Sequence, residues 1–485
     1  MIKKICLVAS LVVYALASGE YAVAEDNVQK TASSNSSPIA PENEKEDNVD
    51  TFEEAIARAW RKNPDLKAAL ADKRRVEEAL RQAKRRYGPD ISGTVSGTRS
   101  RQDDNSFRQG LESISNTRST GTSFGLEINQ NLFHGFSTMN GVRAAESEAK
   151  AALYNLRATE QQLILSVLRA YVNVWSGEQR VVALKKKEEN LKKTIISEEN
   201  KLEAGTGTPA GVAQAEASYQ EAVYKRIAAE TELFSARAEF ERWTGSVASK
   251  DVRLPEVEFD LPRSKDELLK MAERDNPEIL NAKLTARAAE NRFEAARGIA
   301  LYPRVETRAS VSKRVDKSDR GGLIADERRD KSHGVNFSVD LTMTIPFVTC
   351  GSGSTQSNCE MENQRAQNAK YQEQSKYRQI RESCEKSWKQ YEMAKVQIIA
   401  AQAAIKSAQL ASNANFQEST YGTKSITEIL QGENTLLDAT VGYISALVQE
   451  IVAMYTMCSL MGQLTIQLIL QQALPQQNRP LRARE

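Results

Sequence analysis

The sequence contains few of the residues that most often carry out catalysis or bind metals. Its 485 residues include 5 cysteines and 2 histidines, His134 and His333. It has no glycine-rich phosphate loop, nucleophile elbow or group of residues with metal-ligand spacing. Basic and acidic residues nearly balance, at 66 and 64, so no basic surface for nucleic acid is indicated. We therefore predict that the protein is not an enzyme and has no cofactor, metal site or nucleic-acid partner.

Long hydrophobic runs are also missing, so no transmembrane helix is expected in the mature chain. A short apolar run, residues 5–16, follows two lysines and precedes a small-x-small site at 22–24. This pattern is typical of a secretory signal peptide, and a buried N-terminal helix is the alternative. We predict a signal peptide at 1–24, a disordered leader at 25–50, which is poor in apolar residues, and a C-terminal tail at 471–485.

Proline and glycine are scarce over long stretches, which indicates long helices. Residues 141–202 contain no proline and one interior glycine, Gly177. The glycines of Gly205-Thr206-Gly207-Thr208-Pro209 predict a turn, and a second helix is expected to return over about 210–243. The lysine-rich run 185–189 is predicted to be a solvated face of the first helix. The apolar seam of that helix passes through Val181, Leu184, Leu191, Ile195 and Leu202, with interruptions at Glu188 and Glu198.

The mature chain is predicted to consist of two structural repeats, 51–260 and 261–470. Residues 51–87 are echoed 213 positions later, and the turn at Gly205 is echoed 217 positions later. The matching pairs include Asn63 with Asn276, Pro64 with Pro277, Gly205 with Gly422, and Thr206 with Thr423. The second repeat is accordingly expected to contain long helices over about 359–421 and 426–470.

Each repeat also contains residues that alternate between apolar and polar side chains. The predicted strands cover about 91–99, 122–133, 305–315 and 335–346. About ten residues with a period of two have the length and pattern of a tilted transmembrane β-strand. A half-buried sheet in a soluble domain would give the same pattern. The polar connections at about 100–121 and 316–334 are expected to be loops.

Geometry favours the membrane interpretation with several copies of the chain. Four strands cannot close into a barrel, and an open sheet edge is not tolerated in lipid. About eight strands is the smallest sensible barrel, and three copies would give about twelve strands around a lumen too wide for side chains to fill. The sequence thus predicts that several copies of the chain pool their strands, three of them making a homotrimer of about twelve strands, with the strand hairpins in an outer membrane and the helix turns at the far, periplasmic end.

Several motifs, in order, resemble the TolC family of outer-membrane channel proteins over essentially the whole mature length. An Asn-Pro pair opens each repeat, and Leu132-Phe133-His134-Gly135 leads from strand to helix where the family usually has Leu-Phe-Asp-Gly-Gly. Gly205–Thr208 with Val212–Ala217 resembles the first tip motif, and Gly422–Leu430 resembles the second. The resemblance implies a mainly α fold with a membrane β part. Each chain would supply four β-strands and long antiparallel coiled-coil helices, and the trimer would form a barrel of about 12 strands continued by an α-helical tunnel.

The function implied by this resemblance is a passive exit duct in the cell outer membrane, with its helical tunnel in the periplasm. A periplasmic adaptor protein and an inner-membrane transporter would be its partners, together with outer membrane lipid. Such a duct serves a tripartite efflux pump or a type I secretion system and exports drugs, toxic compounds or proteins. The alternatives are an exported coiled-coil structural protein or adhesin without a pore, and a family member dedicated to metal efflux.

The resemblance also assigns the residues of the periplasmic entrance. The pore constriction would be formed at Glu428 and Gln431, where the family's acidic residues ring the pore. The links that hold the closed state match Lys424 as the basic member, Ser419 in place of a tyrosine, and Gly211 in place of a carboxylate. The tip turns match Gly205, Thr206, Gly422 and Thr423. Because two usual partners are missing, we expect a weaker or differently built lock that uses Glu428 or Glu433. As ordinary solvated helix residues, Glu428 and Lys424 would have no such role.

Two cysteines lie at the junction from the last predicted strand to a long helix. Cys350 and Cys359 bracket residues 351–358. An exported chain meets an oxidising compartment, so we predict a disulfide that closes this small loop. The spacing does not favour a metal site, because no histidine lies nearby.

Overall fold

The computed structural model describes residues 51–108, 111–249, 252–255, 259–322, 325–346, 353–420, 424–467 and 469. The predicted signal peptide, leader and C-terminal tail lie outside these residues. Gly422, Thr423 and Cys350 also lie outside them, so the predicted second tip turn and the Cys350–Cys359 disulfide stay predictions.

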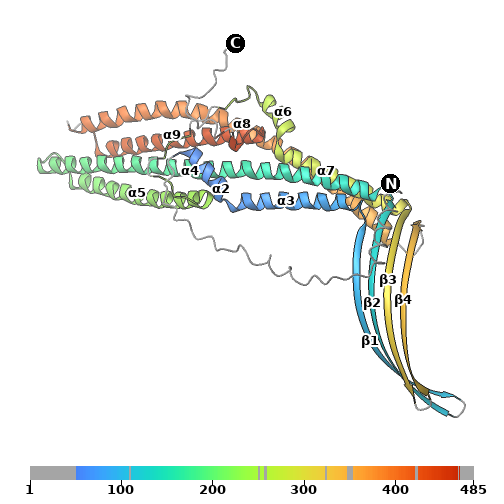
Figure 1. Ribbon diagram of the computed structural model, residues 1–485. Helices are drawn as coiled ribbons and strands as arrows, with labels where there is room; N and C mark the ends of the chain where they lie inside the picture. Colours follow the sequence, from blue (N-terminus) through green and yellow to red (C-terminus); the bar gives the residue numbers. More distant parts are fainter. Residues whose placement is uncertain are drawn as a thin grey trace, which may run out of the picture. The chain divides into compact units, whose positions relative to one another are not determined.

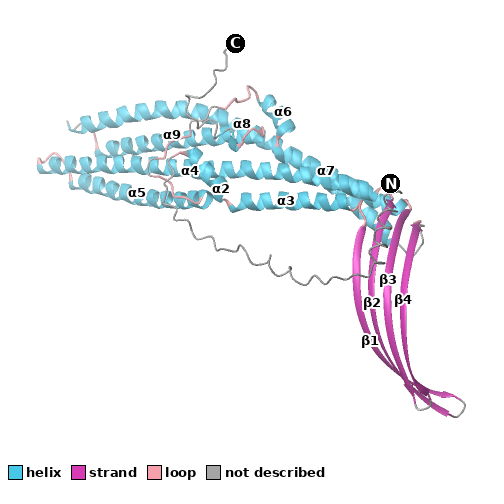
Figure 2. Cartoon of the chain, in the orientation of Figure 1, coloured by secondary structure: helices cyan, strands magenta, loops and turns pink. Residues whose placement is uncertain are grey.

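Within the described residues, both repeats have the same order of elements: two helices, two strands and a long helical hairpin (Figures 1 and 2). The first repeat contains α2 (Phe52–Lys62), α3 (Pro64–Arg85), α4 (Ser137–Glu203) and α5 (Pro209–Thr244). The second contains α6 (Lys265–Asp275), α7 (Pro277–Leu301), α8 (Gly353–Thr420) and α9 (Ile426–Leu460). The long helices nearly match in length, with 67 and 68 residues in α4 and α8 and 36 and 35 in α5 and α9.

The Asn-Pro pairs divide the start of each repeat into two helices. Asn63 and Asn276 have extended backbones, as expected for a residue that precedes proline. Each side chain caps the helix that follows by accepting bonds from the backbone amides two and three residues ahead, at 2.9 and 3.2 Å. Asn276 also donates to the carbonyl oxygen of Leu460 at 3.0 Å. The second cap therefore ties the α6–α7 break to the C-terminus of α9.

The four strands form one antiparallel sheet in sequence order, β1 (Asp90–Arg108), β2 (Leu111–His134), β3 (Arg304–Gly322) and β4 (Ala325–Thr344). The strands continue through most of 100–121 and 316–334, so the expectation of long loops there was wrong. In these segments both faces of the sheet are polar, so the alternation that reveals a strand is lost. Cross-strand pairs still form, as between the hydroxyls of Ser100 and Ser119 at 2.6 Å.

Near the helices, the two faces of the sheet differ sharply. One face is apolar and carries Ile91, Val95, Phe124, Leu126, Ile128, Val305, Ala309, Val311, Val335, Phe337, Val339, Leu341 and Met343. Phe337 and Leu341 remain 67% and 68% exposed in the single chain. The other face is polar, with the Arg308–Glu127 ion pair at 3.0 Å and the Ser310–Ser338 bond at 2.9 Å. The sheet thus has one side suited to an apolar environment and one suited to water.

Helix α9 differs from the sequence expectation in two ways. It ends at Leu460 rather than near 470, because Gly462 takes a left-handed conformation with φ of 72°. A Cβ on Gly462 would lie 2.3 Å from the carbonyl oxygen of Asp275, so only glycine fits there. By length and composition α9 is also apolar enough to cross a membrane, contrary to expectation. Its apolar residues instead contribute to contacts with α4 and α8.

The main hydrophobic core lies where helices of both repeats meet. Four aromatic side chains are fully buried there: Phe52, Tyr171, Phe240 and Tyr455. The Phe52 ring lies 5.5 Å from that of Tyr171 and 5.6 Å from that of Tyr455. Along the long hairpins the core breaks into small clusters, such as Leu191, Ala222 and Leu430. The hairpins are therefore held less by apolar burial as they run toward their turns.

The chain passes from sheet to helix through a close contact between two glycines. Gly135, with φ of 58°, lies between β2 and α4, and Gly298 lies near the end of α7. A Cβ on Gly298 would lie 2.1 Å from the carbonyl oxygen of Gly135, and a Cβ on Gly135 would lie 2.4 Å from that of Gly298. The overlapping atoms are backbone atoms, which cannot move aside as a flexible side chain can. The contact therefore fixes the base of the sheet against α7.

We expect Gly298→Ala to destabilise the protein by about 1–3 kcal/mol or more, because the added methyl group overlaps backbone atoms. Gly141→Ala is the matched control. A Cβ on Gly141 meets no atom within 4 Å, so this change should stabilise α4 by about 0.5–1 kcal/mol through helix propensity. Thermal unfolding followed by circular dichroism in detergent measures both effects. Equal melting temperatures for the two variants would contradict the proposed role of the glycine contact.

Candidate functional site

The first hairpin turn, between α4 and α5, has the geometry that its glycines predict. Gly205 has φ of 74°, and the backbone amides of Thr206 and Gly207 donate to the carbonyl oxygen of Lys201 at 2.9 and 2.8 Å. Thr208 then caps α5 by accepting a bond from the backbone amide of Gly211 at 3.1 Å. Pro209 occupies the first position of α5, where its missing N–H costs nothing.

At the second turn, the start of α9 is held by a capping box. The Ser425 hydroxyl accepts a bond from the backbone amide of Glu428 at 3.4 Å, and the Glu428 carboxylate accepts one from the backbone amide of Ser425 at 3.0 Å. Lys424 forms an ion pair with Glu428 at 3.2 Å. These contacts, first the Ser425 amide and then Lys424, lower the pKa of the Glu428 carboxyl.

The structure brings the predicted constriction residues together. Lys424, Glu428 and Gln431 all line one surface hollow of about 260 Å³ between α8 and α9. Asn415 of α8 lies in the same hollow and donates to the carbonyl oxygen of Glu428 at 3.3 Å. Lys424 therefore pairs with Glu428, whereas Ser419 is hydrogen-bonded to Lys201 and Phe416.

Ser419 and Gly211 have different neighbours, supplied by α4. Ser419 is buried and accepts a bond from the Lys201 amine at 3.4 Å. Lys201 in turn forms an ion pair with Glu198 at 2.6 Å. One oxygen of Glu198 lies 3.2 Å from where a Cβ on Gly211 would be. A carboxylate from the neighbouring helix thus lies beside Gly211, the position where the resemblance predicts a missing acidic residue.

Sequence reasoning did not identify Glu198 and Lys201 as part of this site. The available signal was that Glu198 interrupts an apolar seam. The structure shows that this residue is only 7% exposed. A charged residue at a buried seam position indicates an ion-pair partner nearby, and Lys201, which is partly exposed, is that partner one turn later.

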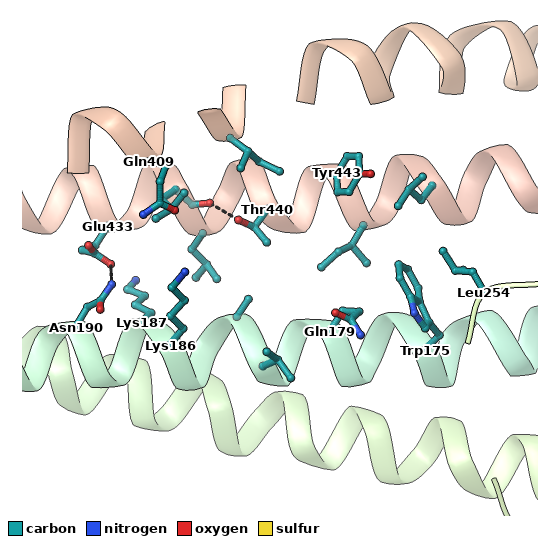
Figure 3. A pocket seen from close by; sticks show the side chains of 17 residues that line it. Trp175, Gln179, Lys186, Lys187, Asn190, Leu254, Gln409, Glu433, Thr440 and Tyr443 are labelled. Atoms are coloured by element: carbon teal, nitrogen blue, oxygen red, sulfur yellow. Dashed lines mark hydrogen bonds between the residues drawn. The ribbon is translucent and has the colours of Figure 1, made fainter. Parts of the chain in front are cut away.

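A second polar cluster joins three helices farther from the turns. Glu433 of α9 accepts bonds from the Ser412 hydroxyl of α8 at 2.6 Å and from the Asn190 amide of α4 at 3.1 Å. Lys187 of α4 donates to the side-chain oxygen of Asn434 in α9. Figure 3 shows Asn190 and Lys187 pointing from α4 toward Glu433. This cluster links the two hairpins of the chain, and we name it the Glu433 cluster.

The Glu433 cluster overturns the prediction that 185–189 is simply a solvated face. Lys187 is 7% exposed, because it lies on the side of α4 that packs against α9. Burial, and then the nearby Lys225, lower the pKa of the Lys187 amine. Glu188 pairs with Arg226 of α5 at 2.8 Å, which lowers the pKa of its carboxyl. Within the run 185–189, Lys187 therefore belongs to the interface with α9 and Glu188 to the interface with α5. The other three residues are exposed.

A cavity of about 580 Å³ adjoins the Glu433 cluster between α4 and the second hairpin (Figure 3). Its walls are mainly apolar and include Trp175, Leu254 and Leu436, whereas Lys186, Lys187 and Glu433 line its polar part. The two hairpins are thus incompletely packed here, and polar contacts supply part of the connection.

The arrangement contains no feature that assigns a cofactor. Among the residues that the structure describes, no group of three or more His, Cys, Asp or Glu side chains is placed to hold a metal ion. The chemistry of this region is that of reversible hydrogen bonds and ion pairs between helices.

Comparison with known proteins extends over most of the chain. A family model described as outer membrane efflux protein matches residues 55–246 and 268–463. The chain is 28% identical over 416 residues to the outer membrane efflux protein BepC of Brucella suis biovar 1 (strain 1330), covering 86% of each chain. It is 22% identical over 382 residues to the outer membrane protein TolC of Escherichia coli (strain K12), covering 78% of this chain and 75% of TolC.

Solved structures show the same fold. The CusC structure aligns with a TM-score of 0.70 at 18% identity, covering 86% of this chain and 93% of CusC. The outer membrane protein VceC from Vibrio cholerae aligns with a TM-score of 0.68 at 16% identity, covering 85% of this chain and 96% of VceC.

We expect Glu433→Ala to lower the free energy of unfolding by about 2 kcal/mol, because it leaves the Ser412 hydroxyl and the Asn190 amide without their acceptor. Glu433→Gln keeps an acceptor and should cost less. Gln431→Ala, an exposed change on the same helix, should stay within about 0.5 kcal/mol of the parent protein. Urea unfolding of the purified proteins in detergent gives these values. A Glu433→Ala variant as stable as Gln431→Ala would contradict the role of the cluster.

Proposed function

The chain belongs to the outer membrane efflux protein family, and we propose from this membership how its elements build an exit duct. The protein is an outer-membrane channel whose helices form a periplasmic tunnel. Our proposal concerns the assembly of that channel, its entrance and its partners.

The observation that carries the proposal is the pairing of the sheet. One apolar face extends across all four strands, whereas β1 and β4 each pair on one side only within the described chain. In lipid, the free backbone groups of both edges need partners. Three copies joined β4 to β1 would supply them and would close a barrel of about 12 strands. The apolar face would then contact lipid, and the polar face would line the lumen.

The helices give the duct its length on the periplasmic side. Helix α4 starts beside the sheet and runs for 67 residues, about 100 Å at a rise of 1.5 Å per residue. Its turn at Gly205 would therefore lie far from the membrane, as would the start of α9. A periplasmic adaptor protein and an inner-membrane transporter would meet the channel at this end. They would supply energy and selectivity to a tripartite efflux pump or a type I secretion system, for the export of drugs, toxic compounds or proteins.

The entrance would be formed where the three copies of α9 begin. Glu428 and Gln431 lie on the exposed side of α9 and would face the axis as one ring of carboxylates and one of amides. The Glu433 cluster and the Lys201–Ser419 bond would hold each second hairpin against its α4 and keep this entrance narrow. Loss of these contacts would let the second hairpin swing outward.

We expect the purified, exported protein to be a trimer that requires detergent. Native mass spectrometry should give about three times the chain mass, and unheated samples should migrate more slowly in gels than heated ones. The cause is the pairing of β4 with β1 of the next copy, which heat disrupts. A monomer that stays in solution without detergent would contradict the proposed assembly.

We expect a cation preference in planar bilayers, because three Glu428 carboxylates would converge at the entrance. Glu428→Gln should reduce this preference, whereas Glu199→Gln, an exposed change on α4, should not. Within one chain, Ser425 and Lys424 lower the pKa of the Glu428 carboxyl, whereas the convergence of three carboxylates at the entrance would raise it. Unchanged ion preference in Glu428→Gln, measured as reversal potential, would contradict this assignment.

A further inference from the structure

The apolar face of the sheet is followed, away from the helices, by a band of cations. The strand register places Arg99, Thr120, Lys317 and Lys331 in one row across the four strands. The next row outward on the same face contains Arg101, Arg118 and Asp319. Lys313 stands closer to the helices, in the row of Val95, Phe124 and Val335. We name Arg99, Arg101, Arg118, Lys313, Lys317 and Lys331 the cationic band.

All six side chains of the cationic band are exposed. Asp319 is the acidic residue within the same rows, and Arg101 pairs with Asp103 farther out at 3.2 Å. The face therefore carries a clear excess of positive charge, although the whole chain is nearly neutral, with 66 basic and 64 acidic residues.

Over the rows that alternate with those of the cationic band, the opposite face is not basic. Its rows contain Ser100, Ser119, Ser318 and Asp330, then Thr98, Gly121, Asp316 and Ser332. Arg314 lies on that face and pairs with Asp316 at 2.8 Å. If the charges served only solubility, both faces of the polar extension would carry them equally. The separation of charge across one sheet indicates an anionic partner on one side.

The position of the cationic band matches the edge of a bilayer. From Met343 to Val335 the apolar face of β4 extends over eight residue-to-residue steps, about 26 Å along the strand and about 20 Å in height at a tilt near 40°. Lys331 follows four residues later, about 10 Å higher by the same geometry. This is the depth of lipid headgroups.

The opposite border of the apolar face is built differently. Phe133, Phe136 and Tyr302 form a ring cluster beside the helices, with centroid distances of 5.3 and 5.6 Å. Aromatic side chains of this kind mark a membrane interface without selecting charge. The two borders therefore suit different leaflets, and the cationic one faces away from the periplasmic helices.

We propose that the cationic band binds the phosphate groups of the phosphorylated glycolipid that forms the outer leaflet of an outer membrane. This inference rests on the proposed function, because it needs the apolar face to contact lipid. Arginine guanidinium and lysine ammonium groups on the strands form rows that a bisphosphorylated headgroup can bridge, and arginine can bind a phosphate through two parallel bonds. The contact would fix the height of the channel in the membrane.

The test compares Lys317→Gln/Lys331→Gln with the control Arg308→Gln/Arg314→Gln. The first pair are cross-strand neighbours in the cationic band, and the second pair lie on the polar face of β3. Native mass spectrometry of the assembled protein would measure binding of bisphosphorylated lipid A and of the same lipid after phosphate removal. Each lost cation should weaken binding about five-fold, so the first variant should bind the phosphorylated lipid about twenty-five-fold more weakly.

The control should bind phosphorylated lipid A like the parent protein, and Lys317→Arg/Lys331→Arg should too, because it keeps both charges. Dephosphorylated lipid A should bind the parent protein at least as weakly as phosphorylated lipid A binds the Gln variant, because it offers no phosphate to any cation of the band. Equal affinity of the parent for both lipids, or equal losses in the Gln variant and the control, would overturn the inference. Bilayer conductance separates the two proposals: a channel that conducts without distinguishing the lipids refutes only the cationic band, whereas a protein that never inserts refutes the duct.

Discussion

A peptide group placed in hydrocarbon must find its hydrogen-bond partner within protein, and the architecture described here depends on that constraint. The four strands satisfy one another internally, but the outer sides of β1 and β4 offer donors and acceptors to a further strand. The single apolar face makes water a poor environment for the sheet and lipid a good one. In the proposed trimer, the assembly and the hollow interior would both follow from completing these bonds around a ring.

The helical part of the chain is stabilised by different interactions, because its surroundings are aqueous. Its apolar clusters become small toward the turns, and polar side chains supply contacts between α4, α8 and α9. A buried polar contact specifies its partner, yet it contributes modest net stability because water can replace either half. Such contacts would suit the proposed entrance, which would be held in one arrangement and released from it. The sheet would be hydrogen-bonded at both edges in the proposed trimer, so its strands could not rearrange in the same way.

The elements that were predictable from sequence are those with a repeating signal. The period-two alternation located the parts of β2 and β4 near the helices, and the absence of proline located α4. The outer halves of the strands were not predicted, because strand segments that are polar on both faces show no alternation between apolar and polar residues. Lys187 was misassigned because charge alone was taken to indicate solvent, whereas the register of α4 against α9 decides its burial. The Glu433 cluster joins Asn190 to a residue 243 positions away, a contact that depends on tertiary packing.

The near-equal lengths of α4 and α8, with 67 and 68 residues, restrict how such a chain can change during evolution. Deleting one residue from a helix rotates everything beyond it by about 100° and shortens it by about 1.5 Å. A deletion in α4 alone would turn Glu198 and Lys201 away from their neighbours and would leave the two tips at different heights. Insertions and deletions should therefore survive only in matched sets that preserve whole turns in both repeats. The duct would lengthen or shorten in discrete steps.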